Sequence, residues 1–324
     1  MASFLYKTLH PALYHGFDQK PPFFEGWYYK LVNADEDHRL AVIPGVILGK
    51  QAHAFIQILD GVQGKSTYHT FPIESFRAAP DEFAVSIANS SFTQDKASLD
   101  IADEIARVRG ELHFSGGTPW PVSLLSPGIM GWYAWIPRME CYHGVLSFDH
   151  LIHGSLELDG REIDFSGGRG YIEKDWGQSF PDAWIWFQSD HFKQPGVCLT
   201  ASVAMIPWLR NAFRGFIVGF WSGRELYRFA TYTGAHIDEL RLDDRRVVWV
   251  IHDRTHTLEL EACQVPGAAL RGPTKVEMGK RVDETLGATI NVRLKFTSGE
   301  LIFAGEGKYA GLEINGDLDR LLGK

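Results

Sequence analysis

Short runs of β-branched and aromatic residues alternate with Gly, Pro, Asp and Asn along the whole chain, a pattern typical of β proteins. No stretch of about 12 residues or more carries the apolar stripe of a helix. Residues 316–322 are predicted to form a short terminal helix, and residues 125–136 a loop or a helical turn. The predicted strands cover residues 26–32, 54–59, 82–88, 110–114, 155–158, 184–189, 197–204, 214–221, 247–251, 258–263, 289–296 and 300–304. Their spacing favours β-sandwiches or barrels over a doubly wound sheet, so the predicted class is all-β.

Turn signals separate several of these runs, and Asp159-Gly160 is typical of a tight hairpin. The loop region around residues 159–168 divides the chain into halves of similar length and strand count. We therefore predict an N-terminal β domain over residues 1–160 and a C-terminal β domain over residues 161–324.

Composition narrows the class of protein. The 324 residues include 40 acidic and 32 basic side chains, for a net charge of -8, which argues against nucleic acid as a partner. No apolar run of about 18 residues indicates a transmembrane helix, and the first residues do not read as a secretory signal. Three cysteines, Cys141, Cys198 and Cys263, are too few and odd in number for a disulfide framework, which suits a reducing compartment. The expected location is cytoplasmic.

Two histidine pairs have a metal-like spacing, His150-x-x-His153 and His252-x-x-x-His256. Asp253-Arg254 within the second pair reads as a turn, and solvated or core histidines are the default interpretation. The sequence therefore predicts no metal site.

Aromatic side chains and charges gather between residues 131 and 192. In the string GYIEKDWG (residues 170–177), an extended backbone places alternate side chains on opposite faces. Ile172, Lys174 and Trp176 then share one face. Three mixed polar and aromatic sets follow from the same rule: Tyr171, Glu173 and Asp175; Trp184, Trp186, Gln188 and Asp190; Arg138, Glu140 and Tyr142. Such faces suit a cleft for an amphipathic ligand. A solvated turn with a local ion pair, and tryptophans that anchor a core, remain the alternative.

A second element, FFEGWYYK (residues 23–30), again embeds an acid and a lysine among aromatics. Together with GYIEKDWGQSFPDAWIWFQ (residues 170–188), it resembles the tocopherol cyclase-like family, which is distantly akin to the carotenoid hydratase (hydroxyneurosporene synthase) group. PRMECYHGVLSFDH (residues 137–150) and RFATYTGA (residues 228–235) extend the resemblance over most of the chain. Plant cyclases often have Asn where this sequence has Asp175, and their chloroplast-targeting extension is missing here, so their substrate carries over poorly.

The resemblance implies two lipocalin-like β-barrel or sandwich domains packed together, without a metal or organic cofactor. It also implies an isomerase activity, the closure of a prenylated hydroquinone to a chromanol. In that reaction a proton adds to a trisubstituted alkene, and the phenol oxygen closes on the tertiary cation.

The residues suit this chemistry, because a carboxylic acid in an apolar pocket has a raised pKa and aromatic faces stabilise a cation. Glu173 is the predicted proton donor, Asp175 or Glu25 the second acid, and Lys174 the group that tethers or polarises the hydroquinone oxygen. The predicted substrate-binding residues are Trp27, Tyr28, Glu140, Tyr142, Tyr171, Trp176, Trp184, Trp186 and Gln188. The same motif is also compatible with a buried structural Glu-Lys-Asp network.

Three functions compete. An enzyme, either a cyclase or a hydratase, needs a buried acid as well as apolar walls, and the repeated pairing of acids with aromatics favours it. A lipocalin-like carrier of a quinone or pigment, and a domain pair whose motifs serve folding alone, are the alternatives. The expected partner is a hydrophobic small molecule, and the sequence indicates no oligomeric state. Residues 126–137 are a candidate lip for transient contact with a membrane surface, or else a buried crossover loop.

Overall fold

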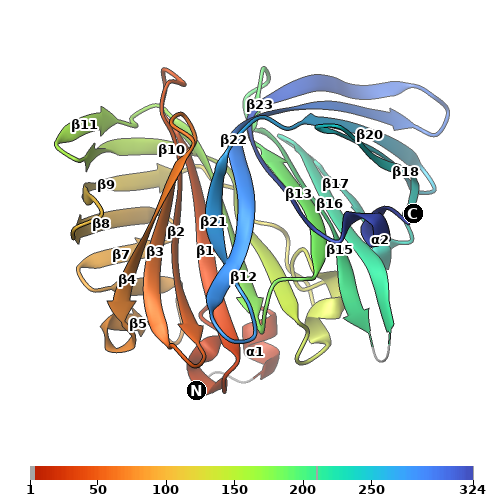
Figure 1. The fold of residues 1–324 in the computed structure, drawn as a ribbon. Helices are drawn as coiled ribbons and strands as arrows, with labels where there is room; N and C mark the ends of the chain where they lie inside the picture. Colours follow the sequence, from red (N-terminus) through yellow and green to blue (C-terminus); the bar gives the residue numbers. More distant parts are fainter. Residues whose placement is uncertain (1–3, 209–210, 324) are drawn as a thin grey trace. The chain divides into compact units, whose positions relative to one another are not determined.

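The described strands pair antiparallel in two sheets, which confirms the all-β prediction. The computed structural model describes residues 4–208 and 211–323. The strand order of the first sheet is β4-β3-β2-β1-β12-β10-β9-β8-β7-β6-β5, with β11 paired to β10. The order of the second is β17-β16-β15-β13-β23-β22-β20-β19-β18, with β14 on β23 and β21 on β22 (Figure 1).

The strands of the first sheet are β1 (Phe23–Val32), β2 (Arg39–Leu48), β3 (His53–Asp60), β4 (Lys65–Pro72), β5 (Phe76–Ala78), β6 (Ala84–Ile87), β7 (Ser90–Thr93), β8 (Lys96–Ala102), β9 (Arg107–Ser115), β10 (Cys141–Leu158), β11 (Arg161–Asp164) and β12 (Arg169–Gly177). Those of the second are β13 (Ala183–Ser189), β14 (His191–Phe192), β15 (Val197–Trp208), β16 (Asn211–Ser222), β17 (Leu226–Ala230), β18 (His236–Asp243), β19 (Arg246–His252), β20 (His256–Cys263), β21 (Ala268–Pro273), β22 (Met278–Phe296) and β23 (Leu301–Gly316).

Helices are short. The α-helices are α1 (Phe4–Thr8) and α2 (Leu318–Leu322), and the 3-10 helices are η1 (Gly16–Asp18), η2 (Ile73–Ser75), η3 (Gly131–Trp135) and η4 (Thr231–Thr233). The predicted terminal helix corresponds to α2, and the helical turn predicted within residues 125–136 corresponds to η3. No helix in the described part of the chain is long and apolar enough to cross a bilayer.

The chain divides into two compact units. Unit 1 comprises residues 1–180 and 270–281, and unit 2 comprises residues 181–269 and 282–324. The boundary expected after residue 160 falls inside unit 1, because β12 pairs with β1 on one side and β10 on the other. Sequence spacing did not reveal that the β21–β22 hairpin belongs partly to unit 1.

Each unit has its own apolar core. Trp27, Tyr29 and Ile172 belong to the core of unit 1, and Ile185 and Phe187 to that of unit 2. The predicted Asp159-Gly160 turn joins β10 to β11, with both residues at positive φ (50° and 84°), as a tight hairpin turn requires. β12 lies between β1 and β10 in the sheet of unit 1, and the face that carries Ile172 packs on the hydrophobic core.

Candidate active site

The candidate site lies on the face of β12 that points away from the core of unit 1. Because directly opposed residues in an antiparallel sheet share a face, the strand registers fix its members. Tyr28 on β1 lies opposite Glu173, and His143 on β10 lies opposite Asp175. Lys30, which is fully buried, lies opposite Tyr171. The predicted face of Tyr171, Glu173 and Asp175 is thus extended on both sides by neighbouring strands.

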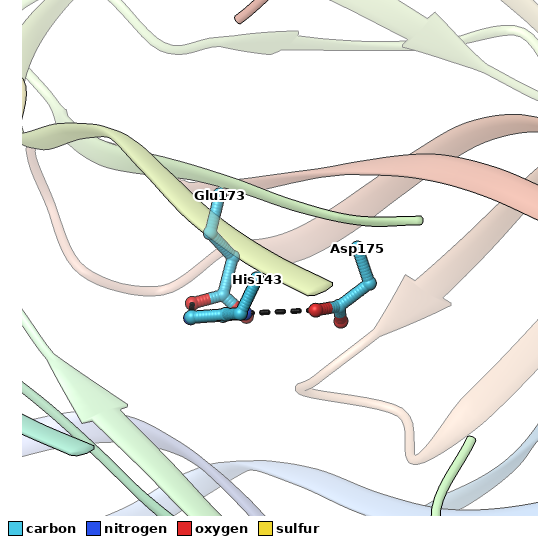
Figure 2. A group of neighbouring side chains, drawn as sticks. All are labelled: His143, Glu173 and Asp175. Atoms are coloured by element: carbon cyan, nitrogen blue, oxygen red, sulfur yellow. Dashed lines mark hydrogen bonds and ion pairs between the residues drawn. The ribbon is translucent and has the colours of Figure 1, made fainter. Parts of the chain in front are cut away.

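His143 links the two carboxyl groups of this face (Figure 2). Its Nδ1 lies 2.8 Å from Oδ1 of Asp175, and its Nε2 lies 3.4 Å from Oε2 of Glu173. The Glu173 side chain is 6% exposed, whereas that of Asp175 is 29% exposed. The imidazole therefore connects a buried acid to one that water reaches.

The Tyr171 hydroxyl donates a hydrogen bond of 2.5 Å to Oε2 of Glu173. Tyr171 is fully buried, so this bond holds the carboxyl group in a fixed orientation. A buried acid with an oriented oxygen and an imidazole beside it is equipped for proton transfer.

The same three groups also offer a set of metal ligands. His143, Glu173 and Asp175 each present one ligand atom, and these atoms lie within 4.8 Å of one another. One imidazole and two carboxylates suit a divalent transition-metal ion. His150 and His153, considered from the sequence, lie three residues apart on β10, the first buried and the second exposed, and are not part of this set.

Lys174 and Glu25 lie on the opposite face of the sheet and form a buried ion pair. Both side chains are fully buried. Lys174 Nζ also donates to the carbonyl oxygen of Leu13 at 2.7 Å, and Glu25 Oε2 accepts from the backbone N–H of His15 at 2.8 Å. The structure does not bring these two predicted catalytic groups to Glu173, and the buried pair joins Lys174 to Glu25 instead of forming the Glu-Lys-Asp network that the sequence left open.

The charges of this network perturb one another. Burial opposes the charged form of Glu25, but Lys174 and the hydrogen bond from His15 outweigh it and lower the pKa of the carboxyl group. Burial lowers the pKa of Lys174, and Glu25 opposes that change. Burial and the Lys174 charge lower the pKa of His15. The lowered pKa of Glu25 favours its carboxylate form, for which Lys174 is the buried counter-charge.

Three further predicted pocket residues lie on this core side. Lys174 Nζ lies 5.0 Å from the ring centroid of Trp27 and 4.8 Å from that of Trp176. Trp176 is stacked between His15, at 4.3 Å, and Tyr142, at 5.4 Å. The indole rings of Trp27 and Trp176 stabilise the ammonium group by cation–π contact.

In unit 2, the predicted residues Trp184, Trp186 and Gln188 alternate along β13 with core residues and share the other face, as expected. All three are buried. The indole of Trp184 donates to Oε2 of Glu313 at 2.6 Å, and Glu313 lies opposite Glu284 in the β22–β23 pair. Gln188 donates to Asp190 at 3.3 Å. Unit 2 thus carries an aromatic face with its own carboxyl groups.

The predicted face of Arg138, Glu140 and Tyr142 does not form, because β10 begins only at Cys141 and Arg138 has a φ of 62°. Glu140 instead accepts a hydrogen bond from Ser179 at 3.1 Å. The sequence did not predict four further polar residues on these faces: His143, Lys30, Glu284 and Glu313. His143 lies beside Asp175 because β10 pairs with β12, and this pairing cannot be read from the sequence.

The candidate lip at residues 126–137 contains both buried and exposed apolar side chains. Ile129 and Met130 are buried, whereas Trp132 is 46% exposed, and the preceding Leu124 and Leu125 are exposed as well. Contact with a membrane surface stays a prediction.

Comparisons with known proteins agree with the predicted resemblance. The sequence profile of the tocopherol cyclase-like family matches residues 119–316. A chloroplastic tocopherol cyclase of Zea mays is 26% identical over 261 residues, which cover 75% of this chain and 52% of the maize protein. The chain thus spans about half the length of this curated relative.

Solved structures share the fold at low identity. Kievitone hydratase from Nectria haematococca has a TM-score of 0.50 at 11% identity, over 94% of either chain. CghA with Sch210972 has a TM-score of 0.56 at 11% identity, over 92% of this chain and 89% of that one. These likenesses support the two-sheet architecture.

Proposed function

We propose that this chain, which belongs to the tocopherol cyclase-like family, is an enzyme that closes a prenylated hydroquinone to a chromanol by acid catalysis. The observation that carries the proposal is the His143 imidazole between the buried carboxyl group of Glu173 and the partly exposed one of Asp175. A carrier needs only apolar walls and an anchor. A buried acid with a route for protons from solvent is a feature of catalysis.

Glu173 is the proton donor in this proposal. Burial disfavours a carboxylate, so the group is held in the protonated form that can donate to an alkene carbon beside it. The C–H bond forms on the less substituted carbon, and a tertiary cation is left on the other. The phenol oxygen then forms the C–O bond to the cation, and its proton returns through His143 to the carboxylate of Glu173. Atoms balance as an isomerisation, and no oxidant or reductant is consumed.

Aromatic rings on the same face stabilise the cation. Tyr28 lies directly opposite Glu173, and Tyr171 precedes it by two residues on the same face. A well-placed ring contributes about 1–2 kcal/mol to a desolvated cation. Lys30, buried opposite Tyr171, is the group on this face that suits the hydroquinone oxygen, in place of Lys174.

The test is turnover of a prenylated methyl-hydroquinone in heavy water under reducing conditions, with the product analysed by mass spectrometry. Asp175 exchanges with solvent, and His143 connects it to Glu173, so the transferred proton is a solvent deuteron. We expect a chromanol with one carbon-bound deuterium. Glu173→Gln keeps the size of the side chain and removes the acid, and it should lower the rate by about 10²–10⁴-fold. Glu104→Gln, in an exposed turn of the same unit, is the matched control and should leave the rate unchanged.

Other outcomes assign other functions. A product that has gained the elements of water identifies a hydratase, in which water traps the same cation. Unchanged substrate that binds tightly in equilibrium dialysis identifies a carrier and refutes catalysis. Full activity of Glu173→Gln removes Glu173 from the donor role.

A further inference from the structure

A pocket lies in unit 1, on the same sheet face as Asp175 but at the edge strand β4. The registers connect Asp175 through Gly26, Gly45 and Phe55 to Thr70 on β4, a span of four strand spacings, or about 19 Å along the sheet. The pocket has a volume of about 540 Å³. It is lined by Gln51, Ala52, His53, Tyr68, Thr70, Arg271, Glu277, Met278 and Gly279, all of which belong to unit 1.

Arg271 supplies a positive charge that is held in place. Its guanidinium carbon lies 4.6 Å from the ring centroid of Tyr68, and that ring is stacked on Phe55 at 5.3 Å. Its backbone is fixed by the buried side chain of Gln57, which accepts from the Arg271 N–H at 2.8 Å and donates to its carbonyl oxygen at 3.3 Å. Within the described ranges no carboxylate forms an ion pair with Arg271. A pre-positioned guanidinium with no internal counter-ion is a site for an anion.

The ring beneath Arg271 is fixed as well. His53 Nδ1 lies 2.6 Å from the carbonyl oxygen of Gln51, so this nitrogen carries a hydrogen. In the neutral imidazole the other nitrogen then accepts the Tyr68 hydroxyl, at 2.7 Å. Burial raises the pKa of Tyr68, so the phenol stays neutral and this bond persists. Tyr68 thus serves as a rigid platform for the guanidinium.

The lining also selects the kind of anion. A volume of this size takes an organic molecule rather than a bare inorganic ion, and Met278 and Ala52 add apolar surface. Glu277 lines the same pocket and is exposed, and its carboxylate repels a doubly charged anion more strongly than a singly charged one. A single charge on an apolar body fits this arrangement.

We propose that this pocket binds a small organic carboxylate, whose charged group pairs with the Arg271 guanidinium and whose apolar part lies on the pocket wall. The site is separate from the one proposed for catalysis and does not depend on it. Arg271 is exposed and its backbone bonds do not involve its side chain, so its replacement leaves the fold intact.

The test is calorimetric titration of the full chain with benzoate, a monoanion, and with phenyl phosphate as the more highly charged counterpart. We expect benzoate to bind at one site and more tightly than phenyl phosphate. Arg271→Met should weaken benzoate binding by at least about ten-fold, because the charge-assisted hydrogen bonds are lost. Arg254→Met, in an exposed turn of unit 2, is the matched control and should bind as the wild type does. Glu277→Gln should narrow the difference between the two ligands.

Three results overturn the proposal. One is the absence of benzoate binding to the wild-type chain. Another is equal binding by the wild type and Arg271→Met, which would place the ligand elsewhere. The third is tighter binding of phenyl phosphate than of benzoate, which would assign the pocket to phosphate esters instead of carboxylates.

Discussion

Replacement of Glu25 by Gln tests whether the buried pair with Lys174 serves the fold instead of the reaction. The substitution keeps the shape of the side chain and leaves the Lys174 ammonium group without a counter-charge in a fully buried position. The bond from Lys174 to the Leu13 carbonyl and the rings of Trp27 and Trp176 remain. The variant therefore removes the charge of the carboxylate together with one of the two oxygens that accept from Lys174 and from the His15 N–H.

The expected loss of stability is large. Breaking a buried ion pair by removal of one partner costs about 3–5 kcal/mol, since the remaining charge is uncompensated. The flanking rings offset part of this cost, and deprotonation of Lys174, whose pKa burial already lowers, offsets another part. We expect unit 1 to lose about 3 kcal/mol of its free energy of unfolding.

The assay is native-state hydrogen exchange of peptides from β1 and β12, with peptides from β18–β20 in unit 2 as the internal reference. A two-unit chain need not unfold in one transition, so a regional measurement is required. Glu25→Gln should lower protection in β1 and β12 by about 10²-fold, and the double variant with Lys174→Met should restore most of it. A loss below about 1 kcal/mol, or a double variant no more stable than Glu25→Gln, would refute a structural role for this pair.

Two further predictions concern protons and metals. The pKa of His15 is lowered in the folded state from 6.5, so the unfolded chain binds more protons as the pH falls through this value. Stability of unit 1 should therefore fall as the pH decreases through about 6.5, and by less in His15→Gln; a parallel decline in both proteins by urea denaturation would contradict this assignment. The three ligand atoms of His143, Glu173 and Asp175 should bind Zn²⁺, measured by competition with a chromogenic chelator, and His143→Asn should weaken that binding by about ten-fold or more; equal affinity would place the metal elsewhere.

Local alternation was sufficient to predict the two faces of β12. Tyr171, Glu173 and Asp175 lie on one side and Lys174 and Trp176 on the other because the side-chain period of a strand is fixed by its backbone. Strand length was harder to predict. β10 runs from Cys141 to Leu158, but its two bulges disturb the alternation, and only its last four residues were expected.

The neighbours of β12 could not be predicted, because strand pairing depends on contacts between residues far apart in the chain. Glu25 and Glu173 looked equivalent in sequence, each an acid among aromatics. Pairing of Trp27 with Lys174 puts Glu25 near Lys174 in the core. Pairing of His143 with Asp175 puts His143 near Glu173 on the other face. A motif thus identifies the residues, and the partners on adjacent strands decide what each residue does.

The assignment of residues 270–281 to unit 1 has an evolutionary consequence. The backbone passes from one unit to the other after Phe180, after Ala269 and after Arg281. A gene fusion or truncation at residue 180 would therefore remove Met278 from its apolar cluster with Phe24, Ile47 and Phe55, and would separate Gln57 from Arg271. Each unit is built from two separate segments of the chain, so a single crossover cannot exchange a whole unit. A library that shuffles the two units therefore needs three matched junctions in place of one.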